Sequence, residues 1–243
     1  MQEYFSQGFV ILKNQFNPTQ LKSAAKRCEQ IKTDNFTYET DGSIRSLFAP
    51  HWYDNTIKEF VYKNPAIPYV QKILGNDLYV HQVHFNYKKA NTGGEYAWHS
   101  DYTFWDAHDG MPSPDAISVL FLLDPMTNEN GPLEILEGSH NDLVIKQNKS
   151  AWTINHDASE TDGMITEDMV SKTAYKRHTV LGNAGDIVLM HANAWHTSAP
   201  NTSNQDRNIL FVCYNKLDNK TTLETRPSHI VLRDFTPVSA NNI

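Results

Sequence analysis

The chain has 243 residues, of which 40% are hydrophobic and 11% aromatic, and its formal net charge is −7. This composition is typical of a folded globular protein and excludes a disordered or collagen-like chain. The acidic balance excludes a general nucleic-acid binder and gives no attraction to anionic membranes. Two cysteines cannot form a disulfide framework.

The N-terminus indicates the compartment. Residues 1–7 have neither the basic start nor the apolar stretch of a secretory signal. The strongest apolar run, residues 119–123, is far shorter than the roughly 20 residues that span a bilayer. We therefore expect a cytoplasmic protein with reduced thiols.

Helical signals come first along the chain and strand signals follow. Asn17-Pro18 begins one expected helix, and Asn64-Pro65 begins a second that ends at Gly75. A short helix is expected after Thr166. Alternating aromatic and β-branched residues predict strands at 78–87, 117–123, 131–136, 187–190 and 209–214. The sequence thus predicts a mainly β barrel or jelly roll with flanking helices, in one domain spanning residues 1–243.

The one unusual feature of this composition is its histidine content, with 11 histidines in an acidic chain. A His-x-Asp pattern on a strand points both side chains to one face, where they can share a metal ion. Two histidines and one carboxylate form the facial triad of non-haem iron sites, which leaves positions open for a cosubstrate and oxygen. The pattern occurs at His99-Ser100-Asp101 and at His140-Asn141-Asp142, although this composition predicts about one occurrence by chance.

Context favours the first copy of the pattern. An extended aromatic stretch precedes His99, whereas His140 follows a turn and is expected in a loop. A third ligand should come from a later strand, where His191 and His196 are both available, with His196 just before a second turn. Arg207 begins the next strand, and a buried cation there needs an anionic partner. That partner is either a carboxylate cosubstrate or an ordinary ion pair with Asp186 or Asp206.

Four segments of the chain resemble the phytanoyl-CoA dioxygenase superfamily of Fe(II)- and 2-oxoglutarate-dependent oxygenases, and ectoine hydroxylases in particular. The longest includes Trp98-His99-Ser100-Asp101, Asp109-Gly110-Met111-Pro112 and Asn130-Gly131-Pro132-Leu133. The other segments are residues 45–51, 196–207 and 226–237. The resemblance begins near Gly8 and continues almost to the C-terminus.

The resemblance implies a double-stranded β-helix, a cupin-like jelly roll, with helices on one side. It implies Fe(II), 2-oxoglutarate as cosubstrate and O2. Iron ligation falls to His99, Asp101 and His196, and the carboxylate implies hydroxylation rather than halogenation. Arg207 would hold the distal carboxylate of 2-oxoglutarate, assisted by Ser198, Asn86 and Lys88. The substrate would be a small, polar, amino-acid-like molecule such as ectoine, hydroxylated at an unactivated C–H bond. Its pocket would be lined by Gln82, His84, Trp105 and Phe211.

Two positions depart from the ectoine hydroxylase pattern, which has Arg at His84 and Phe at Met190. Alternation places Gln82, His84, Asn86 and Lys88 on one face of their strand, which either lines the site or is half-exposed to water. His84 is expected to titrate near neutral pH. Trp195 and Tyr96 are either further wall residues or plain core aromatics.

Other functions remain open. The alternative to an enzyme is a metal-binding jelly roll that acts as a sensor or binding protein. A structural zinc domain is disfavoured because the chain has no paired cysteine ligands. The expected partner is a small-molecule substrate, with no nucleic acid and no membrane, and a homodimer is suggested only by analogy.

Overall fold

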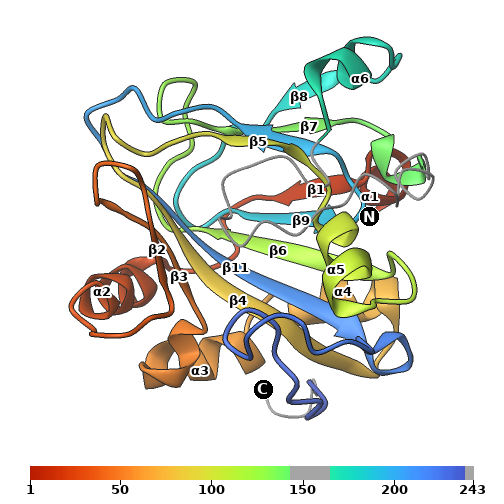
Figure 1. The fold of residues 1–243 in the computed structure, drawn as a ribbon, viewed down its shortest axis with the longest axis horizontal. Helices are drawn as coiled ribbons and strands as arrows, with labels where there is room; N and C mark the ends of the chain where they lie inside the picture. Colours follow the sequence, from red (N-terminus) through yellow and green to blue (C-terminus); the bar gives the residue numbers. More distant parts are fainter. Residues whose placement is uncertain (143–164, 239–243) are drawn as a thin grey trace.

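Two antiparallel sheets form the framework of the computed structural model, which describes residues 1–142 and 165–238 (Figure 1). The larger sheet has seven strands in the order β1 (Phe9–Leu12), β9 (Ile187–His191), β6 (Ala116–Leu122), β11 (Arg207–Lys216), β4 (Leu78–Lys88), β3 (Ile44–Phe48) and β2 (Phe36–Tyr38). The smaller sheet has the order β5 (Tyr96–His99), β10 (His196–Ser198), β7 (Leu133–Leu136) and β8 (Arg177–Thr179).

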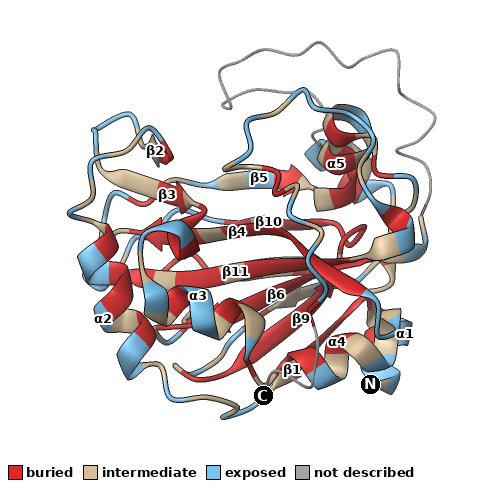
Figure 2. Ribbon diagram, turned by 90° about the horizontal axis from the view of Figure 1, so that it is seen from below, coloured by how far each residue is buried: buried red, intermediate tan, exposed pale blue. Residues whose placement is uncertain are grey.

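Helices cover the outer face of the larger sheet (Figure 2). These are α2 (Thr19–Cys28), α3 (Asn55–Tyr62) and α4 (Ile67–Leu74), while the N-terminal α1 (Gln2–Gln7) adds Tyr4 to the same core. Helix α5 (Asp101–Asp109) follows β5 directly, and the short α6 (Glu167–Ser171) precedes β8. Within the described residues, 3₁₀ turns lie at Pro50–Trp52, Ser139–Asn141 and Leu217–Asn219.

The interior strand β6 is buried along its whole length because it has a core on each face. Val119 and Phe121 pack into the cluster shared with the outer helices. Leu120 and Leu122 pack into a second cluster that lies between the two sheets. This two-sided burial explains why the strand reads as a continuous apolar run rather than as an alternation.

The predicted architecture is confirmed as a cupin-like jelly roll, and the described strands do not close into a barrel. The expected cap at Thr166 is present, since its side chain accepts from the Met169 N–H. Helix α2 begins one residue later than expected, with Pro18 at the N-cap, although the Asn17 side chain still accepts from the Thr19 N–H. Gly75 ends α4 at a φ of 94°. In the described part of the chain, no helix combines the length and the apolar character needed to cross a membrane.

One irregularity of the large sheet affects the site. The register of β4 and β11 shifts between Cys213, which lies opposite Gln82, and Tyr214, which lies opposite Val80. His81 is therefore an extra residue, as in a β-bulge, and bulges re-aim side chains. The His81 ring packs against Trp105 of α5 with the centroids 4.7 Å apart.

Candidate active site

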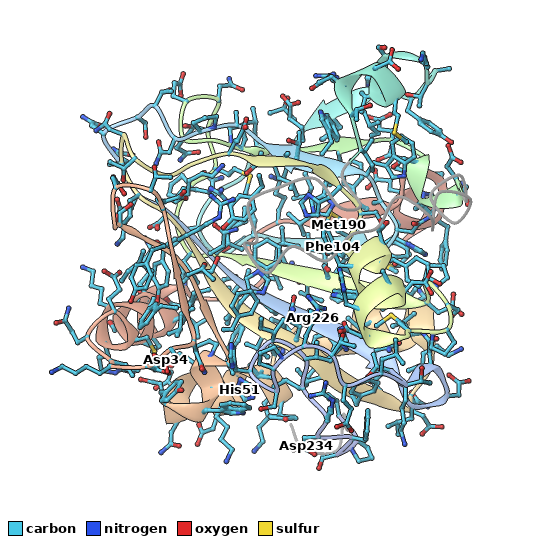
Figure 3. The ribbon with its side chains drawn as sticks, viewed as in Figure 1. Asp34, His51, Phe104, Met190, Arg226 and Asp234 are labelled. Carbon is cyan, nitrogen blue, oxygen red and sulfur yellow. The ribbon has the colours of Figure 1, made fainter. Side chains whose placement is uncertain are left out.

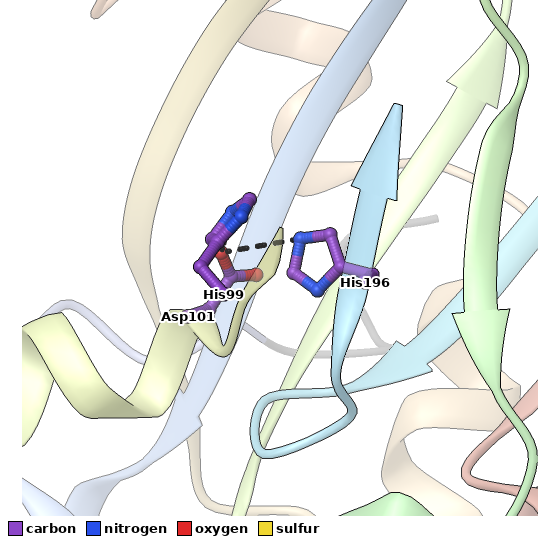
Figure 4. Close-up of side chains that lie close together, drawn as sticks. All are labelled: His99, Asp101 and His196. Atoms are coloured by element: carbon purple, nitrogen blue, oxygen red, sulfur yellow. Dashed lines mark ion pairs between the residues drawn. The ribbon is translucent and has the colours of Figure 1, made fainter. Parts of the chain in front are cut away.

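Three potential metal ligands converge between the sheets from three different element ends (Figure 4). His99 ends β5, Asp101 begins α5 and His196 begins β10, where it pairs directly opposite His99. Asp101 Oδ1 lies 3.8 Å from Nε2 of each histidine. The potential ligand atoms all lie within 4.8 Å of one another, and no other such group of three occurs in residues 1–142 and 165–238.

The expectation that His99 and Asp101 share a strand is wrong. The strand ends at His99, Ser100 has the extended conformation of an N-cap residue, and Asp101 is the first residue of α5. A carboxylate in the first turn interacts favourably with the positive end of the helix dipole. The two side chains thus converge through a strand-to-helix junction. His196 lies on the strand β10, and the turn that was expected to begin at Thr197 begins only after Ser198.

Backbone carbonyls orient both imidazoles. His99 Nδ1 lies 2.7 Å from the Ala97 carbonyl oxygen, and His196 Nδ1 lies 2.9 Å from that of Ala194. Because a carbonyl oxygen only accepts, each Nδ1 carries the proton and each Nε2 presents its lone pair toward Asp101. Burial, followed by the neighbouring His196, lowers the pKa of His99 to about 4, which keeps the ring neutral.

The other two histidine candidates lie outside this group. His140 is in the 3₁₀ turn Ser139–Asn141, and its ring centroid is 5.2 Å from that of His191. His191 Nδ1 accepts from the Asn193 N–H. Two neutral imidazoles and one carboxylate on one side of a centre are the donor set of the non-haem iron triad, so the first His-x-Asp copy with His196 fits Fe(II).

Arg207, the first residue of β11, is 2% exposed, and its Nε and Nη2 have no hydrogen-bond partner. The alternative ion pairs are not formed, because Asp186 pairs with Lys13 and Asp206 pairs with Lys89. Burial lowers the pKa of Arg207 to about 10, so it stays charged at neutral pH. A buried cation with unused donors in a planar fork suits a carboxylate ligand.

The predicted cosubstrate residues gather around Arg207. Lys88 lies opposite it across the β4–β11 pair, and Asn86 is opposite Ile209. Lys88 Nζ donates to Ser198 Oγ at 2.6 Å and to the carbonyl oxygens of Ser198 and Ala199. The Asn86 Oδ1 is buried without a partner. Burial, assisted by Arg207, lowers the pKa of Lys88 to about 6.

The polar face of β4 is turned inward, so the alternative of a half-exposed strand is wrong. Gln82, Asn86 and Lys88 are buried and His84 is partly buried. The His84 ring stacks on Phe211 with the centroids 4.6 Å apart and an interplanar angle of 12°. Burial lowers the pKa of His84 to about 4, so the expected titration near neutral pH is also wrong.

The predicted substrate residues divide into two groups. His84 and Phe211 form the stack. Gln82 instead contacts the C-terminal part of the chain, and Trp105 is part of α5. Gln82 Nε2 donates to the Ile230 carbonyl oxygen, and Trp105 is 2% exposed on α5. Trp195 belongs to a separate cluster that includes Trp98 and Leu136, which favours the core alternative for this residue.

An ion pair that was not predicted from the sequence joins the C-terminal part of the chain to α5. Arg226 binds the fully buried Asp109 through Nε–Oδ1 and Nη2–Oδ2 contacts of 2.9 and 2.5 Å. His81 Nε2 lies 3.7 Å from the same carboxylate. Figure 3 shows Arg226 between α5 and the C-terminal segment, with Phe104 nearer the other end of the helix. Asp109 and Arg226 both lie in segments that carry the family resemblance, and this was the only indication in the sequence that the two residues are important.

Comparison with known proteins identifies relatives of the whole chain. An L-proline trans-4-hydroxylase of Streptomyces griseoviridis is 28% identical, and the match covers 97% of this chain and 92% of the relative. An ectoine dioxygenase of Nocardia farcinica is 29% identical over 95% of this chain and 83% of its own length.

A solved structure of EctD from S. alaskensis with 2-oxoglutarate and 5-hydroxyectoine superposes with a TM-score of 0.83 at 26% identity. That match covers 96% of this chain and 82% of EctD. A second EctD structure contains bound Fe, with a TM-score of 0.84. The phytanoyl-CoA dioxygenase family model matches residues 4–209. The chain therefore belongs to the phytanoyl-CoA dioxygenase family and is an Fe(II)- and 2-oxoglutarate-dependent dioxygenase.

Proposed function

We propose that residues 1–243 form one catalytic domain that hydroxylates an unactivated C–H bond of a small cyclic amino acid or a close analogue. In this proposal His99, Asp101 and His196 hold Fe(II), and Arg207 binds the distal carboxylate of 2-oxoglutarate. The observation that carries the proposal is the three-ligand group lying in the same inter-sheet space as a buried cation with unused donors.

The protein's part in the reaction is positioning and electrostatics. Bound Fe(II) would supply the sites at which 2-oxoglutarate and O2 react, coupling the conversion of 2-oxoglutarate to succinate and CO2 to hydroxylation of the substrate. The backbone carbonyls of Ala97 and Ala194 fix the two imidazoles with Nε2 toward the metal. The Arg207 fork would pair with one carboxylate of 2-oxoglutarate, with Asn86 and Lys88 beside it.

The substrate class follows from the relatives and from the neutral stack. The relatives are named for L-proline and for ectoine, both of which are small cyclic amino acids. The His84–Phe211 stack offers such a ring an uncharged aromatic wall in place of the arginine of the ectoine hydroxylase pattern. We therefore propose that a compact imino or amino acid is preferred, with L-proline and ectoine as the first two candidates.

The test is a panel of cyclic and linear amino acids, scored for both succinate release and a hydroxylated product. Anaerobic Fe(II) with 2-oxoglutarate should give the weak visible charge-transfer band of such sites. His99→Ala should abolish the band and the turnover, while His140→Ala, in the other His-x-Asp copy, should retain both. No band in the unmodified protein would refute the proposal. Metal binding with no succinate release from any compound would instead favour the sensor alternative.

A further inference from the structure

The two oxygens of Asp101 have different surroundings. Oδ1 is the atom that lies 3.8 Å from both histidine Nε2 atoms. Oδ2 instead accepts a hydrogen bond of 2.6 Å from the hydroxyl of Ser118. Since a carboxylate only accepts, Ser118 is the donor in this contact. The carboxylate therefore presents one oxygen toward the metal position and has the other held by the protein.

Ser118 is the one polar residue in β6, whose sequence is AISVLFL, and it is fully buried. Across the sheet it lies opposite Cys213 of β11 and Met190 of β9. Cys213 Sγ is 3.5 Å from the Ser118 oxygen, so a thiol donating to Ser118 leaves the serine proton for Asp101. A hydroxyl buried in an apolar strand is costly unless it is bonded, and here its bond goes to the carboxylate.

A purely structural role does not account for this contact, because the Asp101 side chain is 21% exposed and water can reach it. The serine is thus not required simply to satisfy a buried carboxylate. What it restricts is rotation of the carboxylate group about its own axis. Rotation about the Cβ–Cγ bond would turn Oδ2 toward the metal position as well and let both oxygens bind one ion.

We propose that Ser118 is a positioning residue that makes Asp101 a one-oxygen ligand and so keeps a coordination position open for 2-oxoglutarate or O2. This inference rests on the metal site proposed above. It assigns Ser118 no contact with substrate or cosubstrate. Outer-shell partners of metal ligands typically change metal affinity or activity 10- to 100-fold when they are removed.

The experiment is a titration of metal-free protein with Co(II), followed by calorimetry and by visible absorption, with no substrate or cosubstrate present. Ser118→Ala should bind Co(II) roughly 10-fold more weakly. Its visible bands should also be less intense, because a second carboxylate oxygen raises the coordination number. Ser118→Thr keeps the hydroxyl and should restore both readouts. Ser46→Ala is the matched control, since Ser46 is also a buried strand serine but pairs with Tyr96.

Each outcome decides a separate question. If the unmodified protein binds no Co(II), the metal site itself is refuted. If it binds Co(II) and Ser118→Ala has the same affinity and spectrum, only the role of Ser118 is overturned. Equal effects from Ser46→Ala and Ser118→Ala would also overturn it, since they would reflect a general cost of removing a buried serine. Thermal unfolding of the metal-free variants shows that they are folded, and Ser118→Cys, which retains a weak donor, should be intermediate.

Discussion

Replacing Arg207 by methionine should stabilise the ligand-free protein and abolish its response to 2-oxoglutarate. The guanidinium is 2% exposed with unpaired Nε and Nη2 atoms, and burial lowers its pKa from 12.5 to about 10. At 1.36 kcal/mol per pH unit, this corresponds to about 3 kcal/mol against the charged form. At pH 7 the arginine is protonated in both the folded and the unfolded state, so the full cost is present.

Methionine has a similar length and no charge, so the substitution removes that cost without leaving a large cavity. Even replacing a buried ion pair by apolar side chains is often neutral or gains about 1–4 kcal/mol, and an unpaired buried charge has no partner to lose. For a chain of this size, about 1–3 kcal/mol corresponds to a rise in Tm of roughly 3–9 °C. The ligand-free variant should therefore unfold at a higher temperature than the unmodified protein.

The stability advantage of the variant should shrink sharply when cosubstrate is added. A ligand at 100 times its Kd stabilises the folded state by about 2.7 kcal/mol. Anaerobic Fe(II) with 2-oxoglutarate should give the unmodified protein a gain of this order and the Arg207→Met variant very little. The assay is thermal unfolding with and without 2-oxoglutarate, with Fe(II) present throughout.

Arg27→Met is the matched control, because Arg27 forms an exposed ion pair with Asp54 far from the site in sequence and in the fold. Exposed pairs contribute about 1 kcal/mol or less, and this variant should keep its full response to 2-oxoglutarate. The reasoning is refuted if ligand-free Arg207→Met is less stable than the unmodified protein. An equal gain from 2-oxoglutarate in both proteins would show that Arg207 does not bind it.

Three further outcomes are expected. Arg226→Met should lower the free energy of unfolding, measured with denaturant, by about 3 kcal/mol or more, because it leaves Asp109 buried and unpaired. Adding Asp109→Asn should recover part of that loss, and fully additive losses in the double variant would contradict this. Burial lowers the folded-state pKa of His51 to about 4. Between about pH 6.5 and 4 the unfolded state therefore binds a proton that the folded state does not, and the free energy of unfolding decreases as pH falls through this window. His51→Gln should reduce that slope by up to about 1.36 kcal/mol per pH unit, and an unchanged urea midpoint profile would rule this out. His84→Arg should shift the ratio of kcat/KM values across the substrate panel more than it changes uncoupled 2-oxoglutarate turnover, and equal losses in both would count against the assignment.

Local patterns were enough to predict four of the seven strands of the large sheet, β4, β6, β9 and β11, and two of the outer helices, α2 and α4. The strand at 78–87 appears as β4 because its polar and apolar residues alternate, and Asn17 and Gly75 mark helix ends through backbone chemistry that acts within a few residues. Helix α5 was missed, although Ser100 before Asp101 and Gly110 at a φ of 65° were signals for its two ends. The extended aromatic stretch expected before His99 is correct for β5, but it ends at His99 and gave no sign of the helix that follows.

Contacts across the fold could not be predicted in this way. Ser118 lies in an apolar run, and nothing near it in sequence indicates that β6 brings its hydroxyl to the first residue of α5. The direction of the polar face of β4 was also undetermined, because alternation gives two faces without saying which is covered. The second sheet and the C-terminal segment cover that face, and these are tertiary contacts.

The metal and cosubstrate end of the site is specified more strongly than the substrate end, for a physical reason. Unpaired buried groups such as Arg207 and Asn86 Oδ1 destabilise the free protein, so their presence points to a polar ligand that pairs with them. The His84–Phe211 stack is favourable on its own and therefore says less about what lies against it. Gln82 is tied to Ile230, in the C-terminal segment beyond the family match that ends at residue 209. Relatives that share this metal chemistry are named for L-proline and for ectoine, which fits a substrate end that these contacts specify less tightly than the metal end.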